Sequence, residues 1–455
     1  MRLTIICLLP FILLPLVTVS GQSIEPAMID ESLVATDGLY FAGERGTDYQ
    51  FGSRISAHGD CMAIVNGFVF VSWYRGGMDR RNLMLSRRRV DTPEAEWVTI
   101  EFPDRHIGYR GDTTKGDSHN TAAVAVSMID STVHLLYDMH AYDAENFPDH
   151  YFNYRVTAPG AAFVADADFT RERFNDRRDY LVEGKNYERT TYPGFVTDAQ
   201  GRLIVGYRLG GSGSGEHLLA VYDSTGWNES FSWAQGRIPL PHRYSVYGSM
   251  KMEQGKLHSG FSIRYAEREK YVYNSGLYYA YALPPYGLTD WYDVDDQPIR
   301  LPIGRADAVQ LATPAADYGT AEPSRTSSGP EFTVSGRGDI HFITTVDGRN
   351  VHYWRPAGSQ RFSSAVGGVI PSGKLYSSGD ILIGVELSDG RIRIRTAPVG
   401  TNDWQTVYTK TDGPQFSHFR SELVDGLLYA YLQEQTGGDA RPLYLQIFDL
   451  KLTRQ

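Results

Sequence analysis

Four side chains that can move protons or hold an anion lie at the ends of two neighbouring predicted hairpins. His119 stands just before the apolar strand 121–126, and His140 follows the strand that returns from it. Tyr192 and Arg208 bear the same relation to the next hairpin. Because an antiparallel pair brings the start of one strand beside the end of the other, each pair is expected to meet. A single histidine or tyrosine at a strand end usually packs or caps, so the duplicated placement is what favours a site.

A set of histidine, tyrosine and arginine without a paired carboxylate favours elimination over hydrolysis. Glycoside hydrolysis generally uses two Asp or Glu side chains, and the sequence shows no recognisable pair. β-Elimination at a uronic acid needs an arginine to neutralise the sugar carboxylate, a base for the proton α to it and an acid for the departing oxygen. A histidine with a pKa near ~6.5 and a tyrosine suit the last two roles. These residue types leave open which of His119, His140 and Tyr192 removes the proton, and whether one tyrosine serves as both base and acid.

The elements that must position these residues are short strands joined by tight turns. Seven strand–turn–strand units, spaced roughly 40 to 80 residues apart, are typical of a β-propeller. Their turns lie at Asn66-Gly67, Asp130, Gln200-Gly201, Gln254-Gly255, Gly336 to Gly338, Ser378-Gly379 and Asp425-Gly426. The sequence therefore predicts an all-β, seven-bladed β-propeller. Two sandwiches or barrels in series are the alternative, which no Pro/Ser-rich linker supports. Asp166 to Arg178 is the one candidate for a short helix.

The composition agrees with this architecture. The chain has 455 residues, of which 13% are aromatic, and it contains 46 Gly. Aromatic side chains suit a pleated surface and glycine suits turns. With 42% hydrophobic and 22% charged residues, the chain is not expected to be a coiled coil, a disordered protein or a cysteine scaffold.

The first 21 residues have the pattern of a secretion signal. Leu3 to Val19 is almost wholly apolar and is followed by the small residues Ser20 and Gly21. We therefore expect a secreted or periplasmic protein, with residues 22–455 forming a single catalytic propeller that has no membrane span. Cys61 would then be the only cysteine, so no internal disulfide is expected. Nucleic acid is not an expected partner for an exported chain of net charge −10.

Three other features have both a structural and a functional interpretation. The arginines at 75, 80, 81 and 87–89 could form a solvated face or a patch for anionic polymers. His58 and Cys61 could supply two metal ligands, although a buried thiol beside a structural histidine is favoured. The glycine-rich stretch from Gly210 to Gly215 is either a flexible loop or a place where the backbone approaches a ligand closely.

Several of these segments together resemble the β-propeller ulvan lyases of polysaccharide lyase families 24 and 25. They are Gly116-Asp117-Ser118-His119-Asn120, Tyr137-x-x-His140, and Tyr192 sixteen residues before Arg208. The segment HGDCMAIVNGFVFVSWYRGG at 58–77 is most similar to family 25. The resemblance implies a seven-bladed propeller with a substrate canyon. It also implies cleavage of ulvan, a sulfated polymer of rhamnose and uronic acids, leaving an unsaturated uronyl end.

The resemblance also implies a role for each site residue. His119 matches the general base, Tyr192 the general acid, Arg208 the carboxylate neutraliser and His140 a second canyon histidine. Further substrate contacts are expected from Arg264, Tyr265, Asn120 and Tyr247.

No cofactor is needed for such chemistry, although a structural zinc or calcium ion is compatible with it. His217, His242 and His258 are available as ligands, whereas Asn274-Ser275-Gly276 departs from the Asn-His-Asp of related propellers. The expected partner is an anionic sulfated polysaccharide, bound by a monomer. Two alternatives stay open: a propeller lyase acting on another uronate polymer, and a non-catalytic carbohydrate-binding propeller.

Overall fold

The computed structural model describes residues 24–77, 79–92, 94–235, 244–265, 274–303, 310–312, 329–346 and 348–452, with the backbone alone at 265, 275 and 310–312. Within these ranges, no helix is long and apolar enough to cross a membrane. The strands are, in chain order, β1 (Ala27–Leu39), β2 (Met62–Val65), β3 (Phe68–Tyr74), β4 (Asn82–Arg89), β5 (Val98–Arg105), β6 (Ala122–Ser127), β7 (Thr132–Tyr137), β8 (Tyr154–Val156), β9 (Thr190–Thr197), β10 (Leu203–Leu209), β11 (Glu216–Asp223), β12 (Gly226–Trp227), β13 (Phe231–Gln235), β14 (Tyr244–Glu253), β15 (Lys256–Tyr265), β16 (Ser275–Ala282), β17 (Trp291–Tyr292), β18 (Gln310–Ala312), β19 (Glu331–Val334), β20 (Ile340–Val346), β21 (Arg349–Arg355), β22 (Ser363–Val366), β23 (Lys374–Ser378), β24 (Ile381–Ser388), β25 (Arg391–Pro398), β26 (Gln405–Thr409), β27 (Phe416–Val424), β28 (Leu427–Glu434) and β29 (Ala440–Asp449). Short 3-10 segments are η1 (Ala161–Phe163), η2 (Asp166–Asp168) and η3 (Arg171–Arg173).

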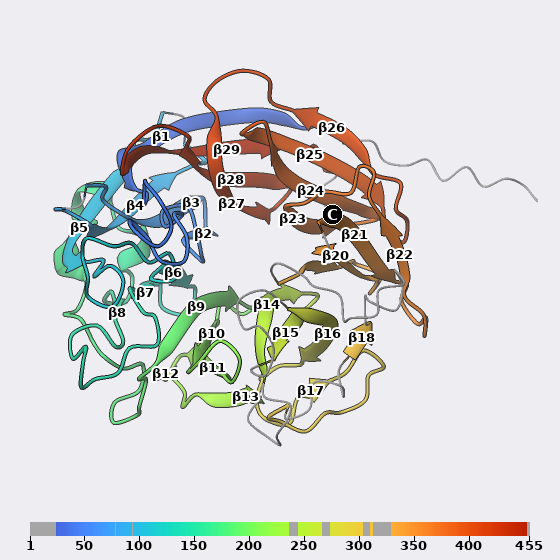
Figure 1. The fold of residues 1–455 in the computed structure, drawn as a ribbon, viewed down its shortest axis with the longest axis horizontal. Coiled ribbons are helices and arrows are strands. Elements are labelled where there is room, and N and C mark those ends of the chain that lie inside the picture. Colours follow the sequence, from blue (N-terminus) through green and yellow to red (C-terminus); the bar gives the residue numbers. More distant parts are fainter. Residues whose placement is uncertain are drawn as a thin grey trace, which may run out of the picture.

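In the described part of the chain, the strands form seven antiparallel sheets arranged as blades around a central axis (Figure 1). Blade 1 is β2–β5, blade 2 is β6–β8, blade 3 is β9–β13, blade 4 is β14–β18, blade 5 is β19–β22, blade 6 is β23–β26, and blade 7 is β27–β29 with β1. The first strands of most neighbouring blades contact one another, so this edge of each blade faces the axis. The predicted seven-bladed propeller is confirmed, and two separate sandwiches are excluded because the ring is continuous.

The predicted turns join the first two strands of every blade. Their residues explain the geometry, because a two-residue hairpin turn compatible with strand twist needs positive φ at both positions. Asn66 and Gly67 have φ of 49° and 75°, and Asp425 and Gly426 have φ of 50° and 79°. Asn, Asp and Gly tolerate this left-handed region best, so their presence allowed these hairpin turns to be predicted from the sequence.

The N-terminal strand closes the ring, a feature that the sequence did not predict. β1 pairs antiparallel with β29, so that Ala27 lies opposite Asp449 and Leu39 lies opposite Ala440. Leu39 is fully buried, whereas Ile29 on the same strand is 57% exposed. The two ends of the described chain are therefore held in one sheet, and blade 7 is complete only when both are present.

The hydrophobic core is divided among the seven interfaces between adjacent blades. At the closing interface, for example, Val69 and Trp73 of blade 1 pack against Tyr431 and Leu445 of blade 7. Equivalent clusters fill each of the other six interfaces. Because each fully buried apolar side chain contributes about 1.5–3 kcal/mol, these clusters fix the angular position of every blade.

The insertion between β8 and β9 corrects one prediction from the sequence. The short helix predicted for Asp166 to Arg178 is wrong, because the segment forms only η2 and η3. Phe169 and Phe174 are instead anchored in the cluster between blades 1 and 2. Arg87 lies fully buried under this insertion, where it donates hydrogen bonds to the carbonyl oxygens of Ala162 and Val164.

The arginine-rich segment of blade 1 does not form one anionic-polymer surface. Arg88 pairs with Asp30, and Arg89 pairs with Asp91 at 2.7 Å. Arg75 pairs with Asp37 and Glu101. Arg75 and Arg88 therefore hold neighbouring elements together, whereas the pair of Arg89 with Asp91 is local.

Candidate active site on the propeller axis

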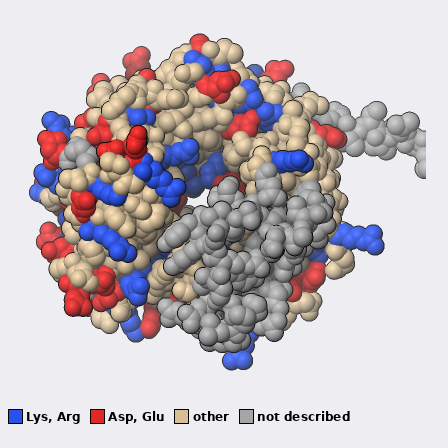
Figure 2. All heavy atoms as spheres, viewed as in Figure 1, with Lys and Arg blue, Asp and Glu red and all other residues tan. Residues whose placement is uncertain are grey.

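A cavity of about 610 Å³ lies where the seven blades meet, and it is the main candidate for a binding site. Every blade contributes to its wall from its first strand or the loop leading into that strand. Representative residues, in blade order, are Asp60, Thr121, Phe195, Tyr247, Glu331, Lys374 and Arg420. Figure 2 shows the hollow at the centre of the ring, with basic side chains gathered at its edge. We call this space the axial cavity.

The two histidines of the first hairpin meet as predicted. Their rings stack with centroids 4.2 Å apart and planes inclined by only 6°. Asp117 is fully buried and joins the two rings: its two oxygens accept hydrogen bonds from Nδ1 of His119 at 3.0 Å and from Nδ1 of His140 at 2.6 Å. His119 lines the axial cavity, whereas His140 is not among the residues that line it.

Tyr192 reaches the axial cavity from a bulge in β9. The pairing of β9 with β10 shifts register between Gly206 and Arg208, and Tyr192 adopts φ of 56°. This left-handed backbone is unfavourable for a tyrosine and must be held by the surrounding structure. It leaves the side chain 41% exposed, with its ring centroid 5.4 Å from that of His119.

Arg208 completes a second cluster with Tyr247 and Arg264. Its guanidinium lies 4.8 Å from the centre of the Tyr192 ring and donates to the Tyr247 hydroxyl at 3.1 Å. Arg264 donates to the same hydroxyl at 3.4 Å and lies 4.2 Å from the Tyr247 ring centre. The predicted meeting of Tyr192 and Arg208 is confirmed, and two arginines and two tyrosines form one continuous group.

The glycine-rich loop supports this group by close approach of its backbone. Tyr247 donates a hydrogen bond to the carbonyl oxygen of Ser212 at 3.1 Å. A Cβ atom at Gly215 would stand 2.6 Å from Cδ of Arg208, so only glycine fits against that side chain. The backbone of this stretch thus approaches Arg208 closely at Gly215, while the predicted approach to a ligand stays a prediction.

The surroundings of His119, Asp117 and Tyr192 shift the pKa of each side chain. Burial lowers the pKa of His119 below its usual 6.5, although its hydrogen bond to Asp117 opposes the shift. Burial also disfavours ionised Asp117, but hydrogen bonds from both histidines hold its pKa well below the usual range. The walls of the cavity raise the pKa of the Tyr192 phenol above 10 by desolvation, which the Arg208 cation partly offsets. At neutral pH the site thus presents a neutral histidine, an ionised aspartate and a protonated tyrosine.

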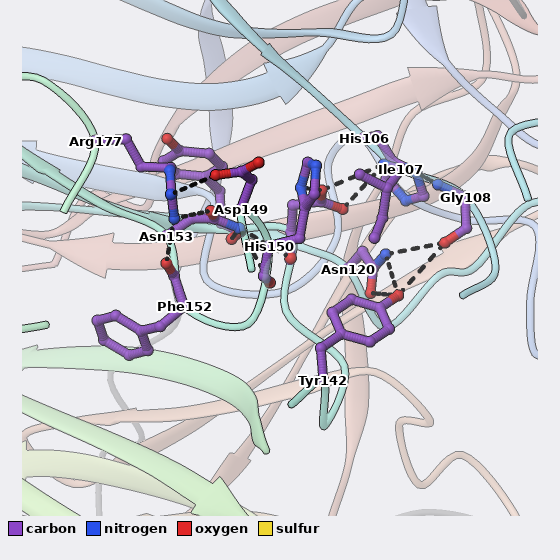
Figure 3. A network of polar contacts seen from close by, with 12 residues as sticks. His106, Ile107, Gly108, Asn120, Tyr142, Asp149, His150, Phe152, Asn153 and Arg177 are labelled. Carbon is purple, nitrogen blue, oxygen red and sulfur yellow. Dashed lines mark hydrogen bonds and ion pairs between the residues drawn. The ribbon is translucent and has the colours of Figure 1, made fainter. Parts of the chain in front are cut away.

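Of the two remaining predicted contacts, Asn120 and Tyr265, the structure describes the side chain of Asn120 alone. Asn120, expected to touch substrate, is fully buried and bonds to the Tyr142 hydroxyl and the Gly108 carbonyl oxygen (Figure 3). It therefore supports the loop behind the site rather than reaching the axial cavity. The side chain of Tyr265 lies outside the described residues.

The histidines considered as metal ligands have other partners. Nε2 of His217 accepts the backbone N–H of Val246 at 3.0 Å. Both ring nitrogens of His258 are bonded, to the Tyr279 hydroxyl and to a backbone carbonyl oxygen. His242 lies outside the described residues. Cys61 is buried in the cluster between blades 7 and 1, and burial raises its thiol pKa to about 12, which agrees with a structural role.

Within the described residues, one group has three donors close enough for a metal ion: Asp117, His119 and His140, whose donor atoms lie within 4.8 Å of one another. Its carboxylate oxygens and Nδ1 atoms already satisfy one another by hydrogen bonding. The set is therefore complete as a hydrogen-bonded unit. Asp117 belongs to the motif Gly116 to Asn120 but had no predicted role, and the available signal was its position two residues before His119.

Comparison with known proteins agrees with this geometry. Residues 68–364 match the BNR repeat-containing family. The crystal structure of the polysaccharide lyase Uly1 superposes with a TM-score of 0.84 and 30% identity, covering 93% of this chain and all of that one. The short isoform of ulvan lyase from Alteromonas sp. (strain LOR) is 34% identical over 94% of this chain and 91% of its own length. This chain belongs to the ulvan lyase family.

Longer members of the ulvan lyase family also match most of the chain. A long isoform from Alteromonas sp. is 37% identical over 89% of this chain, but over 44% of its own length. The chain thus spans about half the length of the long relatives that it matches. The matched part covers 89–97% of this chain.

Proposed function

We propose that this protein cleaves ulvan by β-elimination in the axial cavity. The observation that carries the proposal is the convergence of a neutral histidine, a protonated tyrosine and a buried arginine on one wall of that cavity. Relatives that share the propeller are named ulvan lyases, which supports the same substrate. A uronic acid in ulvan supplies the acidic carbon–hydrogen bond that such a set can break.

Each residue has one role in the proposed reaction. Arg208 neutralises the sugar carboxylate, so that the α proton becomes acidic enough to remove. His119 takes that proton, and the electron pair forms the C4–C5 double bond as the C4–O bond breaks. Tyr192 donates its proton to the departing oxygen. His119 is assigned as the base because it lines the axial cavity beside Tyr192, whereas His140 is not among the residues that line it.

We propose that no resident metal takes part in the chemical step, because the histidines, tyrosine and arginine account for both proton transfers and for the carboxylate charge. We further propose that the protein is exported and acts as a monomer, the leader-like residues 1–21 being the support for export. Lys374 and Arg420 also line the cavity, but Lys374 is paired with Glu331, and Arg420 is paired with Asp60 and Glu422. The positive charge that favours an anionic sulfated polymer is therefore assigned to Arg208.

The experiment that tests this proposal follows ultraviolet absorbance of the unsaturated uronyl product on ulvan, alginate, heparin and pectate. Cleavage of ulvan alone supports the proposed substrate. Cleavage of another polymer in preference to ulvan would reassign the substrate while keeping the reaction. Binding of ulvan without any product would leave a carbohydrate-binding propeller and remove the lyase proposal.

A further inference from the structure

The roles proposed for Arg208, His119 and Tyr192 do not involve the buried carboxylate of Asp117. It accepts one hydrogen bond from each of two stacked imidazoles, through Oδ1 to His119 and through Oδ2 to His140. We propose that Asp117 is a positioning residue that fixes both rings in the Nδ1–H tautomer and thereby presents the unprotonated Nε2 of His119 to the substrate. The effect on catalysis rests on the proposed lyase function, whereas the assignment of the two tautomers does not depend on it.

The tautomer follows from the partners of each ring. A neutral imidazole has one N–H donor and one acceptor nitrogen. An ionised carboxylate only accepts hydrogen bonds, so both Nδ1 atoms must carry hydrogen. No described residue bonds to Nε2 of either ring, which leaves that nitrogen as the acceptor that a base requires. A carboxylate behind a histidine orients the ring and selects its tautomer in the same way in hydrolytic triads.

Both rings are also held against rotation. The ring of Phe51 packs nearly perpendicular to both imidazoles, with centroid distances of 4.5 Å to His119 and 5.1 Å to His140. An isolated bridge between His140 and Thr191 ties this hairpin end to β9, next to Tyr192. The stacked pair therefore keeps a fixed position relative to the tyrosine on the neighbouring blade.

The loop that carries Asp117 has its own buried support, part of which Figure 3 shows. His106 accepts the backbone N–H of Gly108 at its Nδ1, so its Nε2 donates to the carbonyl oxygen of Asp117 at 3.0 Å. The backbone N–H of His119 donates to Oδ1 of Asp117 at 3.0 Å. Asn120 fixes the next turn of the loop through Tyr142. These contacts fix the position of the Asp117 carboxylate, so that it can orient the two imidazoles.

The matched comparison is Asp117→Asn against Asp138→Asn. Asp138 is also buried and lies on the same hairpin, but its oxygens accept from the Ile107 backbone and pair with His150. An asparagine at 117 has one acceptor oxygen and one donor nitrogen, so it can serve only one ring in the Nδ1–H form. The other ring must turn or change to the Nε2–H tautomer.

The direct readout is nitrogen NMR of histidine-labelled protein without substrate, assigned by removing His119 or His140 in turn. We expect Nδ1–H for both rings in the unaltered protein and in Asp138→Asn, and an Nε2–H signal from one of them in Asp117→Asn. With ulvan, Asp117→Asn is expected to lose about 10²-fold in kcat with KM unchanged and with an altered pH profile. Asp138→Asn is expected to keep the pH profile of the unaltered protein.

An Nε2–H tautomer at either ring of the unaltered protein would overturn the proposal, and so would an Asp117→Asn variant that keeps both tautomers and its kcat. The measurement on the unaltered protein remains decisive even if Asp117→Asn does not fold. If the tautomers are as expected but no uronate polymer is cleaved, the proposed function fails while the positioning role stands. If ulvan is cleaved and the tautomers differ, the positioning role alone fails.

Discussion

At the scale of single residues, the proposed reaction depends on the charge state of three side chains in the axial cavity. Burial keeps His119 neutral, and the cavity wall keeps the Tyr192 phenol protonated. The guanidinium of Arg208 supplies a positive charge beside the Tyr192 ring. These three states are the ones that proton removal, proton donation and carboxylate neutralisation require.

Replacing Arg208 should remove most activity without unfolding the protein. Arg208→Ala leaves the sugar carboxylate charged, so the α proton is no longer acidic, and we expect a loss of about 10²-fold or more in kcat/KM. Steady-state kinetics on ulvan measure the loss, and thermal unfolding reports the fold. Arg202→Ala is the control, since Arg202 pairs with Asp198 away from the axial cavity and its loss should leave kcat/KM unchanged. Near-native turnover by Arg208→Ala would refute the assigned role.

Tyr192→Phe and His119→Ala should each lower kcat by about 10²-fold or more, the usual scale for groups that transfer protons. Single-turnover rates on ulvan measure each loss. Because Phe keeps the ring that packs below Arg208, binding of ulvan should persist in Tyr192→Phe. A variant that loses binding in parallel with rate would show that Tyr192 acts through the structure of the site rather than as an acid.

The pH profile should have a plateau that extends from near neutrality into the alkaline range. Activity requires neutral His119, so it is present above the histidine pKa, which lies below 6.5, and is lost as pH falls through it. Activity also requires protonated Tyr192, so it is lost only as pH rises through a pKa above 10. The pH dependence of kcat/KM checks both limbs. An activity that declines between pH about 7 and 9 would contradict the pair of assignments.

At the scale of elements, the site depends on where strands start and end. His119 and His140 meet because one hairpin brings its ends together, and the β9 bulge turns Tyr192 toward them. The sequence could predict these meetings, since antiparallel pairing depends only on the hairpin turn. It could not predict that Asn120 is buried, because that depends on Tyr142 from a loop with no regular pattern. Asp117 was overlooked for a related reason: its two partners become visible only when both hairpin ends are in place.

Ring closure by β1 can be tested within a single strand. Leu39→Ala removes a fully buried side chain and should lower the free energy of unfolding by about 2–5 kcal/mol. Ile29→Ala on the same strand removes a side chain that is 57% exposed and should change it by less than about 0.5 kcal/mol. Chemical denaturation of the two variants makes the comparison. Equal effects would show that β1 adds little to the closure of blade 7.

At the scale of the whole molecule, the propeller builds one axial cavity from seven blades. The turn-forming residues and alternating strands allowed the blade number to be predicted. Closure through β1 was not predicted, because pairing between the two ends of a chain leaves no local signal. The ion pairs of the arginine-rich segment of blade 1 also left no local signal, because its arginines pair with residues distant in the sequence, such as Asp30 and Asp166.

Removal of metal ions should leave the reaction rate unchanged. The proposed chemistry uses only side chains, and the Asp117, His119 and His140 atoms are paired with one another. Dialysis against a chelator followed by the ulvan assay checks this, with metal content measured before and after. Loss of kcat on dialysis with recovery on adding zinc or calcium, while the unfolding temperature stays constant, would place a metal in the chemical step.

The most direct test of the central claim is the mass of the oligosaccharides released from ulvan. β-Elimination by His119, Tyr192 and Arg208 predicts non-reducing ends that carry an unsaturated uronyl residue and have gained no water, and it predicts their loss in Arg208→Ala. Fragments with saturated ends, each heavier by one water molecule, would show hydrolysis and would contradict the account.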